Sequence, residues 1–203
     1  ELLRDGRLRE EDKRATAVSE IHAQATRMLG LVTDYLGAHA AENAALPVRR
    51  ERIDLVAHAR AACGRHEPSA AGKQQSIAGP NGEPPVWAHA DPGLLAQVTD
   101  NFISNAVKFS PRGASIRLEV GRRDGVASLA VVDTGPGIPA EEQAGLFRKF
   151  GRTSTRPTGG EPSHGLGLAL AKRLAGAMGG NVGCESPVTE REPGEAKRGA
   201  RFW

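Results

Sequence analysis

Three polar side chains are spaced so that they project from one side of a helix. Asn101 and Asn105 lie four residues apart, and Lys108 follows one turn later. An amide oxygen is a hard, neutral ligand that can complete a magnesium shell beside phosphates, and a lysine can neutralise phosphate oxygens. The alternative is a solvated helix face with two asparagines, although asparagine is a poor helix former. The spacing therefore indicates a stripe that could hold a magnesium–phosphate group.

A carboxylate followed by glycines forms a second candidate group. Asp133 ends an apolar stretch and is followed by Gly135 and Gly137. A buried carboxylate can accept the exocyclic amine of adenine, and glycines let the backbone approach a flat ring closely. A tight turn capped by an aspartate would explain the same letters. We therefore interpret this segment as a possible base-binding turn.

Two further glycines stand at the predicted start of a helix. The backbone amides of Gly165 and Gly167 would be free there, and the helix dipole favours an anion such as a triphosphate. Upstream of them, residues 139–163 contain many glycines and prolines, which is typical of a mobile loop. Together these segments supply the parts of a complete nucleotide site, namely a carboxylate, an amide, a lysine, a glycine-rich helix start and a flexible cover.

The elements that position these groups alternate between helices and strands. Apolar residues recur at helical spacing in the segment that begins at Asp91-Pro92 and carries the asparagines. The remaining predicted helices are 54–66, ended by Pro68, a short helix at 141–147, and 165–178. The predicted strands are 48–53, 75–78 in a hairpin with 86–88, 115–120 in a hairpin with 126–132, 181–185 and 200–203.

The first quarter of the chain has a different pattern. Apolar residues between Glu10 and Asn43 follow a heptad stripe, and Leu29 and Leu36 widen it. Such a helix is typical of a four-helix bundle, and residues 1–6 resemble the end of a preceding helix stopped by glycine. A lone amphipathic helix folded onto the following domain is the alternative.

Four segments, in their order along the chain, resemble the N box, first glycine box, F box and second glycine box of sensor histidine kinases. They are 101–110, 133–138, 147–152 and 164–168. These kinases belong to the superfamily of gyrase, chaperone, histidine kinase and mismatch-repair ATPases. The resemblance implies a two-layer α/β sandwich of the Bergerat type, with a mixed sheet and three helices on one face, over residues 46–203. Residues 1–45 resemble the end of helix 1 and helix 2 of the dimerisation and histidine-phosphotransfer hairpin, part of a dimeric four-helix bundle.

The resemblance also assigns roles to individual residues. It implies that Asn105 binds Mg²⁺ and that Lys108 and Arg152 reach the phosphates of ATP, making these three the catalytic residues. Asp133 would hold adenine, while Phe147 and Phe150 would anchor an ATP lid at about 139–163. The full set of implied ATP-binding residues is Asn101, Asn105, Lys108, Phe109, Asp133, Gly135, Gly137, Ile138, Phe147, Phe150, Arg152, His164, Gly165, Leu166, Gly167 and Leu168.

The reaction expected of such a site is phosphoryl transfer rather than hydrolysis. The hydrolysing branches of the superfamily carry a glutamate as general base where this chain has Asn101, and a neutral amide cannot take a proton from water. The expected activity is transfer of the γ-phosphoryl group to a histidine and then to an aspartate of a response-regulator receiver domain, with homodimerisation through the helical hairpin. A degenerate scaffold without nucleotide binding and an anti-sigma-factor serine kinase are the alternatives.

The acceptor histidine is not found in the chain. The family's His-Glu-x-x-x-Pro type of box is missing, and His66-Glu67-Pro68 follows the wrong helix with its proline too soon. His22 lies on the predicted bundle helix but beside the core position Ile21. We therefore expect the acceptor upstream of Glu1.

Composition limits the remaining possibilities. The net charge is +3, but the arginines are scattered among acids without an accompanying aromatic run, so we expect no nucleic-acid binding. No apolar stretch approaches the roughly 20 residues of a membrane span. The two cysteines lack CxxC spacing, which indicates neither a disulfide framework nor zinc. A cytoplasmic location is expected.

Overall fold

The computed structural model describes residues 46–151, 153–159, 161, 165–188 and 199–203, with the side chain of Arg123 excepted. All of them belong to one compact unit, which spans Ala44–Trp203. The heptad helix predicted between Glu10 and Asn43 lies outside the described residues. Its identity as a bundle helix, and the domain boundary at residue 46, remain predictions. None of the described helices combines the length and the apolar character that a membrane crossing requires.

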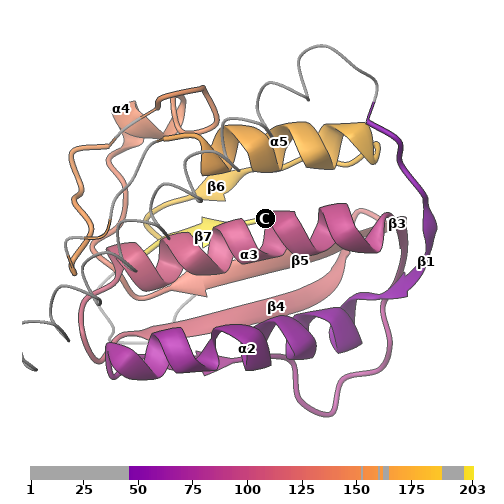
Figure 1. The fold of residues 1–203 in the computed structure, drawn as a ribbon, viewed down its shortest axis with the longest axis horizontal. Helices are drawn as coiled ribbons and strands as arrows, with labels where there is room; N and C mark the ends of the chain where they lie inside the picture. The colour runs from indigo at the N-terminus through magenta and orange to yellow at the C-terminus, as the bar shows by residue number, and fades with distance from the viewer. Residues whose placement is uncertain (1–45, 152, 160, 162–164, 189–198) are drawn as a thin grey trace, which may run out of the picture. The chain divides into compact units, whose positions relative to one another are not determined.

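The described unit has two layers, one of helices and one of sheet (Figure 1). The sheet has the strand order β2-β4-β5-β7-β6 and is mixed, because β2 runs parallel to β4 while the other pairs are antiparallel. Three helices, α2, α3 and α5, cover one of its faces. The predicted α/β sandwich with three helices on one face of a mixed sheet is confirmed.

The bounds of the elements are as follows. The helices are α2 (Leu55–Gly72), α3 (Pro92–Phe109), α4 (Ala140–Gln143) and α5 (Gly167–Ala177). The five-stranded sheet consists of β2 (Ser76–Ala78), β4 (Ser115–Arg123), β5 (Val126–Asp133), β6 (Cys184–Glu185) and β7 (Arg201–Phe202). A separate antiparallel pair joins β1 (Glu51–Asp54) to β3 (Trp87–Ala90).

The core lies between the helices and the sheet, and α3 contributes its centre. Phe102 and Ile103 are almost fully buried, and so are Ile116 of β4 and Val131 of β5. The ring of Phe102 lies 5.8 Å from that of Phe202 in β7, centroid to centroid. Because these apolar residues occupy one face of α3, the opposite face carries the polar stripe of asparagines and lysine.

Aspartates start both long helices. Asp54 accepts the N–H of Val56 at the start of α2, and Asp91 accepts the N–H groups of Gly93 and Leu94 at the start of α3. Such side chains satisfy amide groups that have no partner inside the helix. These two caps fix where each helix begins, as the sequence predicted.

The prediction that Pro68 ends the second helix was wrong. Helix α2 continues through Pro68 to Gly72. Gly64, whose carbonyl would have accepted a bond from residue 68, is exposed, as is Pro68 itself, so the interrupted bond lies on the solvent side. The final turn of α2 buries Ala70, which is 1% exposed and whose carbonyl accepts the N–H of Gln75. Packing of this turn outweighs the missing hydrogen bond.

The predicted hairpin between residues 75–78 and 86–88 was also wrong. Strand β2 pairs in parallel with β4, and β3 pairs with β1. The short intervening loop permitted a hairpin, but Ile77 aligns with Ile116 and packs against the core when β2 joins the main sheet. Several other predicted elements are shorter than expected, among them α4, β6 and β7.

Candidate nucleotide-binding site

The polar stripe of α3 is arranged as the spacing predicted. The amide nitrogen of Asn101 donates to the carbonyl of Gln97 at 3.0 Å, which directs its Oδ1 towards α5. Asn105 and Lys108 are half-buried, and within the described part of the chain their side chains form no hydrogen bond or ion pair. One turn of α3 therefore presents an amide and an ammonium group that are available to a ligand.

Asp133 stands at the end of β5, where the sheet gives way to a glycine turn. It is only 7% exposed. Its Oδ1 accepts the N–H of Gly135 at 2.7 Å and that of Ala200 at 3.3 Å. A Cβ atom on Gly135 would lie 2.7 Å from this oxygen and 3.3 Å from Oγ of Ser110, so only glycine fits the turn. The carboxylate is thus oriented by backbone amides of two segments.

The turn that follows is supported by a residue that the sequence did not single out. Gly137 adopts φ +82°, a left-handed conformation that glycine accommodates. The N–H of Ile138 donates to Oγ of Ser186 at 2.8 Å, and Ser186 donates to the carbonyl of Gly199 at 2.7 Å. Gln143 donates to the carbonyls of Ile138 and Ser186. Ser186 was missed because no local pattern reports a contact across 48 residues.

The F box and the second glycine box meet through their backbones. The N–H of Phe150 donates to the carbonyl of Gly165 at 2.9 Å. A Cβ atom on Gly165 would lie 2.6 Å from the carbonyl oxygen of Gly151, and Gly165 has φ +69°. Phe147 packs against the core, whereas Phe150 is 69% exposed. Phe150 thus contacts the second glycine box through its backbone, and the anchoring of a lid by Phe147 and Phe150 remains a prediction.

Helix α5 begins against α3. A Cβ atom on Gly167 would meet Oδ1 of Asn101, so glycine is required where the two helices approach. Leu166 is buried, and Leu168 packs against the core, which fixes the start of α5. The structure thus brings the N box and the second glycine box into direct contact.

Of the remaining predicted site residues, some lie within the described part of the chain and others outside it. Phe109, the last residue of α3, is half-buried beside the fully buried Ser110. Arg152 and His164, which the sequence assigned to the site, lie outside the described residues. Their contribution remains a prediction.

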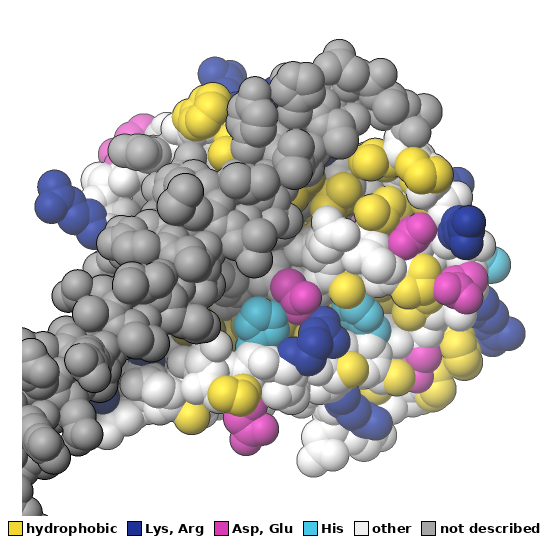
Figure 2. Space-filling model, viewed as in Figure 1, with side chains coloured by type: hydrophobic (Ala, Val, Ile, Leu, Met, Phe, Trp, Pro, Cys, Tyr) yellow, Lys and Arg dark blue, Asp and Glu magenta, His cyan; other side chains and the backbone are white. Residues whose placement is uncertain are grey.

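The acidic residue that precedes Asn101 is engaged away from this stripe. Oδ1 of Asp100 accepts hydrogen bonds from Arg65 at 2.9 Å and from His66 at 3.0 Å, both on α2. Next to them, His58 contacts Oγ of Thr99 at 3.0 Å. Figure 2 shows these basic, acidic and histidine side chains gathered where α2 and α3 adjoin. Asp100 therefore belongs to the contact between the two helices.

Burial controls the protonation of two groups near these elements. Burial raises the pKa of the Cys184 thiol to about 12, and the charges of Asp133 and Glu185 add to the effect. Burial also lowers the pKa of His58, with a further lowering by Arg65 that Asp100 partly opposes. At neutral pH the Cys184 thiol is therefore protonated and His58 is neutral.

A buried polar group at the end of α3 was missed by sequence reasoning. Nε2 of Gln75 lies within 3.1 Å of the carbonyls of Val107, Ser110 and Pro111. Oγ of Ser110 and Oε1 of Gln75 are buried without a hydrogen-bond partner among the described residues. The Ser110 hydroxyl is the unsatisfied group that lies beside the Asp133–Gly135 turn.

Comparison with known proteins agrees with this geometry. Residues 90–203 match the family described as histidine kinase-, DNA gyrase B-, and HSP90-like ATPases. The chain is 46% identical to the circadian input-output histidine kinase CikA of Synechococcus elongatus over 102 residues, which cover 49% of this chain and 13% of CikA. It is 32% identical to the adaptive-response sensory kinase SasA of a Synechococcus species, over 93% of this chain and 50% of SasA.

A solved structure is also similar to this chain. The crystal structure of full-length ShkA in complex with AMPPNP has a TM-score of 0.69 to this chain at 32% identity, and the match covers 87% of this chain and 35% of ShkA. The chain spans half or less of the length of these relatives. With the family match extending over more than half of its residues, the chain belongs to the histidine kinase, DNA gyrase B and HSP90-like ATPases, as a catalytic domain of the sensor histidine kinase type.

Proposed function

We propose that this chain binds Mg²⁺-ATP between α3, the Asp133 turn and the start of α5, and donates the γ-phosphoryl group to a histidine. The observation that carries the proposal is the contact between α3 and α5. It sets Oδ1 of Asn101 against Gly167, so the proposed metal-binding face of α3 adjoins a helix N-terminus that favours phosphates. The phosphoryl group would then pass to an aspartate of a receiver domain.

The residues around Asp133 fit an adenine ring. The carboxylate is oriented by two backbone N–H groups, and Gly135 keeps the space beside it free of side chains. The buried hydroxyl of Ser110, unpaired among the described residues, offers a further polar partner at the same turn. A carboxylate that accepts the exocyclic amine of adenine would favour ATP over GTP, whose ring carries a carbonyl at that position.

The phosphates and the metal would be held by α3 and α5. Asn105 supplies an uncharged oxygen ligand and Lys108 a positive charge, and neither side chain is engaged by another described residue. Bound Mg²⁺ would neutralise charge on the phosphate oxygens. Arg152, from outside the described residues, is proposed to reach the same phosphates.

The arrangement supports transfer to a protein acceptor better than hydrolysis. Asn101 stands where the hydrolysing branches carry a glutamate, and its amide cannot accept a proton from water. The neighbouring carboxylate, Asp100, is held by Arg65 and His66 on the side of α2. Catalysis would rest on positioning and charge neutralisation, as is general for phosphoryl transfer.

Calorimetric titration with AMPPNP tests nucleotide binding. The chain should bind AMPPNP more tightly with Mg²⁺ than with EDTA, and Asn105→Ala should remove most of that difference while binding in EDTA is retained. Absence of binding at millimolar AMPPNP would overturn the proposal and favour a degenerate scaffold.

Phosphorylation of the full-length protein tests the acceptor class. Incubation with radiolabelled ATP and Mg²⁺ should give a protein-bound label that is labile in acid and stable in base, as expected of phosphohistidine. Acid-stable label would indicate a hydroxyl acceptor and thus a serine kinase. Rapid release of free phosphate without labelling would contradict the absence of a water-activating base. Homodimerisation through the helical hairpin and a cytoplasmic location belong to the same proposal.

A further inference from the structure

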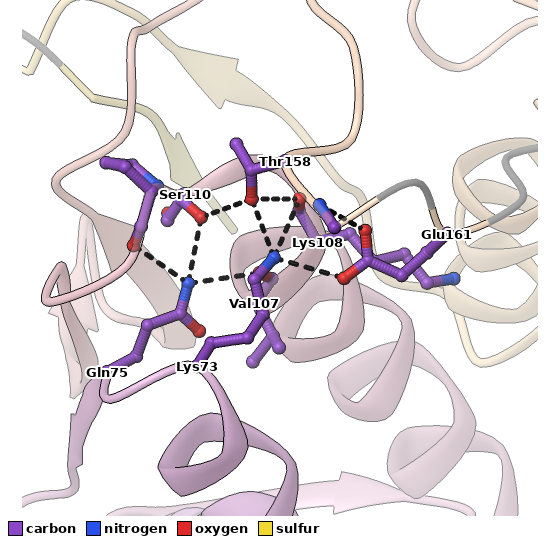
Figure 3. A network of polar contacts seen from close by, with 9 residues as sticks. Lys73, Gln75, Val107, Lys108, Ser110, Thr158 and Glu161 are labelled. Carbon is purple, nitrogen blue, oxygen red and sulfur yellow. Dashed lines mark hydrogen bonds and ion pairs between the residues drawn. The ribbon is translucent and has the colours of Figure 1, made fainter.

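A single lysine joins three parts of the domain at the end of α3 (Figure 3). Nζ of Lys73, the residue after α2, lies 2.7 Å from Oγ1 of Thr158 and 3.1 Å from Oε1 of Glu161. It also lies 2.8 Å from the carbonyl oxygen of Val107 and 3.2 Å from that of Lys108. The Lys73 side chain is 14% exposed, so these contacts are formed largely away from solvent.

On the α3 side, the ammonium group of Lys73 meets carbonyls that have no partner within the helix. The last four carbonyls of a helix lack intrahelical donors, and the helix dipole places partial negative charge there. Val107 and Lys108 belong to this last turn, where Gln75 adds a further donor to the carbonyl of Val107. Taken alone, these contacts would make Lys73 a helix cap.

On the other side, Lys73 meets the segment that the sequence identified as the lid. The N–H of Thr158 donates to the carbonyl of Lys108 at 2.9 Å, and its hydroxyl lies 2.8 Å from the carbonyl of Ser110. The carboxylate of Glu161 accepts the N–H of Gly159 with one oxygen and Nζ of Lys73 with the other. The lid residues are thus attached to the same helix end that Lys73 caps.

The Glu161 carboxylate carries its charge at neutral pH. Although partial burial raises its pKa, the hydrogen bonds to the carboxylate, including the one from Lys73, lower it below the usual value. Lys73 and Glu161 therefore form an ion pair 88 residues apart in the chain. A helix cap needs no such pair, so this contact distinguishes a lid-docking role from simple capping.

We propose that Lys73 is a positioning residue that docks the lid, through Thr158 and Glu161, on the C-terminal turn of α3, and that this docking slows the release of ATP. The retention part rests on the function proposed above. The docking point is the carbonyl of Lys108, whose ammonium group is proposed to bind phosphate. Docking at this point therefore holds the lid on the nucleotide-binding turn of α3.

The docking is tested on the ligand-free chain by hydrogen exchange at the Thr158 amide. Neutralising the ion pair with Glu161→Gln should accelerate exchange roughly two- to fivefold, as expected for a partly exposed pair. Lys73→Met, which loses four contacts, should accelerate it by on the order of tenfold or more. Arg65→Met is the matched control, because it removes a cation of α2 that binds α3 through Asp100 and has no contact with the described lid residues.

The experiments distinguish failure of the lid docking from failure of the proposed nucleotide-binding function. An unprotected Thr158 amide in the wild-type chain, or the same exchange rate in Glu161→Gln as in wild type, would overturn the docking. Stopped-flow release of a fluorescent ATP analogue should be faster in Glu161→Gln by about the factor seen in exchange, and unchanged in Arg65→Met. Faster exchange with unaltered release would overturn the role in retention. A wild-type chain that binds no nucleotide would instead overturn the proposed function, while the exchange comparison would still decide whether Lys73 docks the lid.

Discussion

The first residue of α5, Gly167, faces Oδ1 of Asn101 in α3 so closely that a methyl group would overlap that oxygen. Because the amide nitrogen of Asn101 is already held by the carbonyl of Gln97, the side chain has little room to rotate away. Glycine at this position is therefore a requirement of the site, where two helices from distant parts of the chain meet.

Gly167→Ala should consequently weaken AMPPNP binding. The added methyl group would displace Asn101 and separate α3 from the start of α5, and we expect at least a tenfold loss of affinity by calorimetry. Gly176→Ala is the matched control in the same helix, since a Cβ atom there meets nothing within 4 Å. It should raise the free energy of unfolding by about 0.5–1 kcal/mol, the usual gain of alanine over glycine in a helix, and leave binding unchanged. Equal affinities of the two variants would refute the argument.

Asp133→Asn should remove recognition of adenine while preserving the turn. The asparagine oxygen can still accept the N–H groups of Gly135 and Ala200, but an amide nitrogen would replace the second carboxylate oxygen. We expect AMPPNP affinity to fall on the order of 10- to 100-fold, as for loss of a charge-assisted hydrogen bond.

Asp124→Asn provides the comparison for this substitution. Asp124 occupies the β4–β5 turn with φ +51°, a conformation that asparagine also tolerates. The same chemical change there, at the far end of β5, should leave both the melting temperature and the affinity unaltered. Retention of tight AMPPNP binding by Asp133→Asn would exclude this carboxylate from the base pocket.

The stability of the domain should decrease as the pH falls below about 6.5, and His58 should be one cause. Burial lowers its pKa in the folded state, assisted by Arg65 and partly opposed by Asp100, so the unfolded chain binds a proton first. The stabilising effect of neutral His58 is complete above the unfolded pKa and is lost as the pH drops towards the lower folded value.

Urea unfolding of the wild type and His58→Gln between pH 5.5 and 8.5 checks this effect. The variant should lose less stability than the wild type between pH 6.5 and 5.5, because glutamine does not titrate. Above pH 7.5 the two curves should run parallel, which serves as an internal control. Parallel curves over the whole range would show that His58 does not contribute to the acid sensitivity.

The thiol of Cys184 should be unreactive in the folded domain. Burial and the nearby charges of Asp133 and Glu185 raise its pKa to about 12, and the thiolate is the reactive form. In a Cys63→Ser background at pH 8, we expect alkylation by iodoacetamide to be slower in the folded protein than in urea by on the order of 100-fold or more. Comparable rates in both conditions would mean that Cys184 is accessible and ordinarily acidic.

The parts of the site within single elements could be predicted from the sequence. Helical spacing placed Asn101, Asn105 and Lys108 on one face of α3, and the apolar residues between them indicated which face is buried. The predicted hairpin of residues 115–120 with 126–132 is likewise the observed pairing of β4 with β5. These features depend on local periodicity and turn geometry, which a sequence displays directly.

The contacts between distant segments could not be predicted in this way. No local pattern indicated the roles of Lys73 and Gln75, because each side chain contacts the end of α3, more than 30 residues later. The hydrogen bond between Ser186 and Ile138 likewise joins segments that are distant in the chain. The wrong partner given to β2 has a similar origin, since a short loop suggested a hairpin, whereas β2 joins β4 with the partly buried Ile77 aligned with the buried Ile116.

The position of β7 has a consequence for how the domain acquires its activity. This strand lies between β5 and β6, although it follows both in the chain, and Ala200 at its start exchanges hydrogen bonds with Asp133. Among the described residues, β6 pairs in the sheet only with β7, and Ala200 supplies an amide donor to Asp133 beside that of Gly135. The proposed base pocket therefore depends on β7, and a chain shortened before residue 200 would keep its nucleotide-binding motifs but lose the amide that Ala200 donates to Asp133.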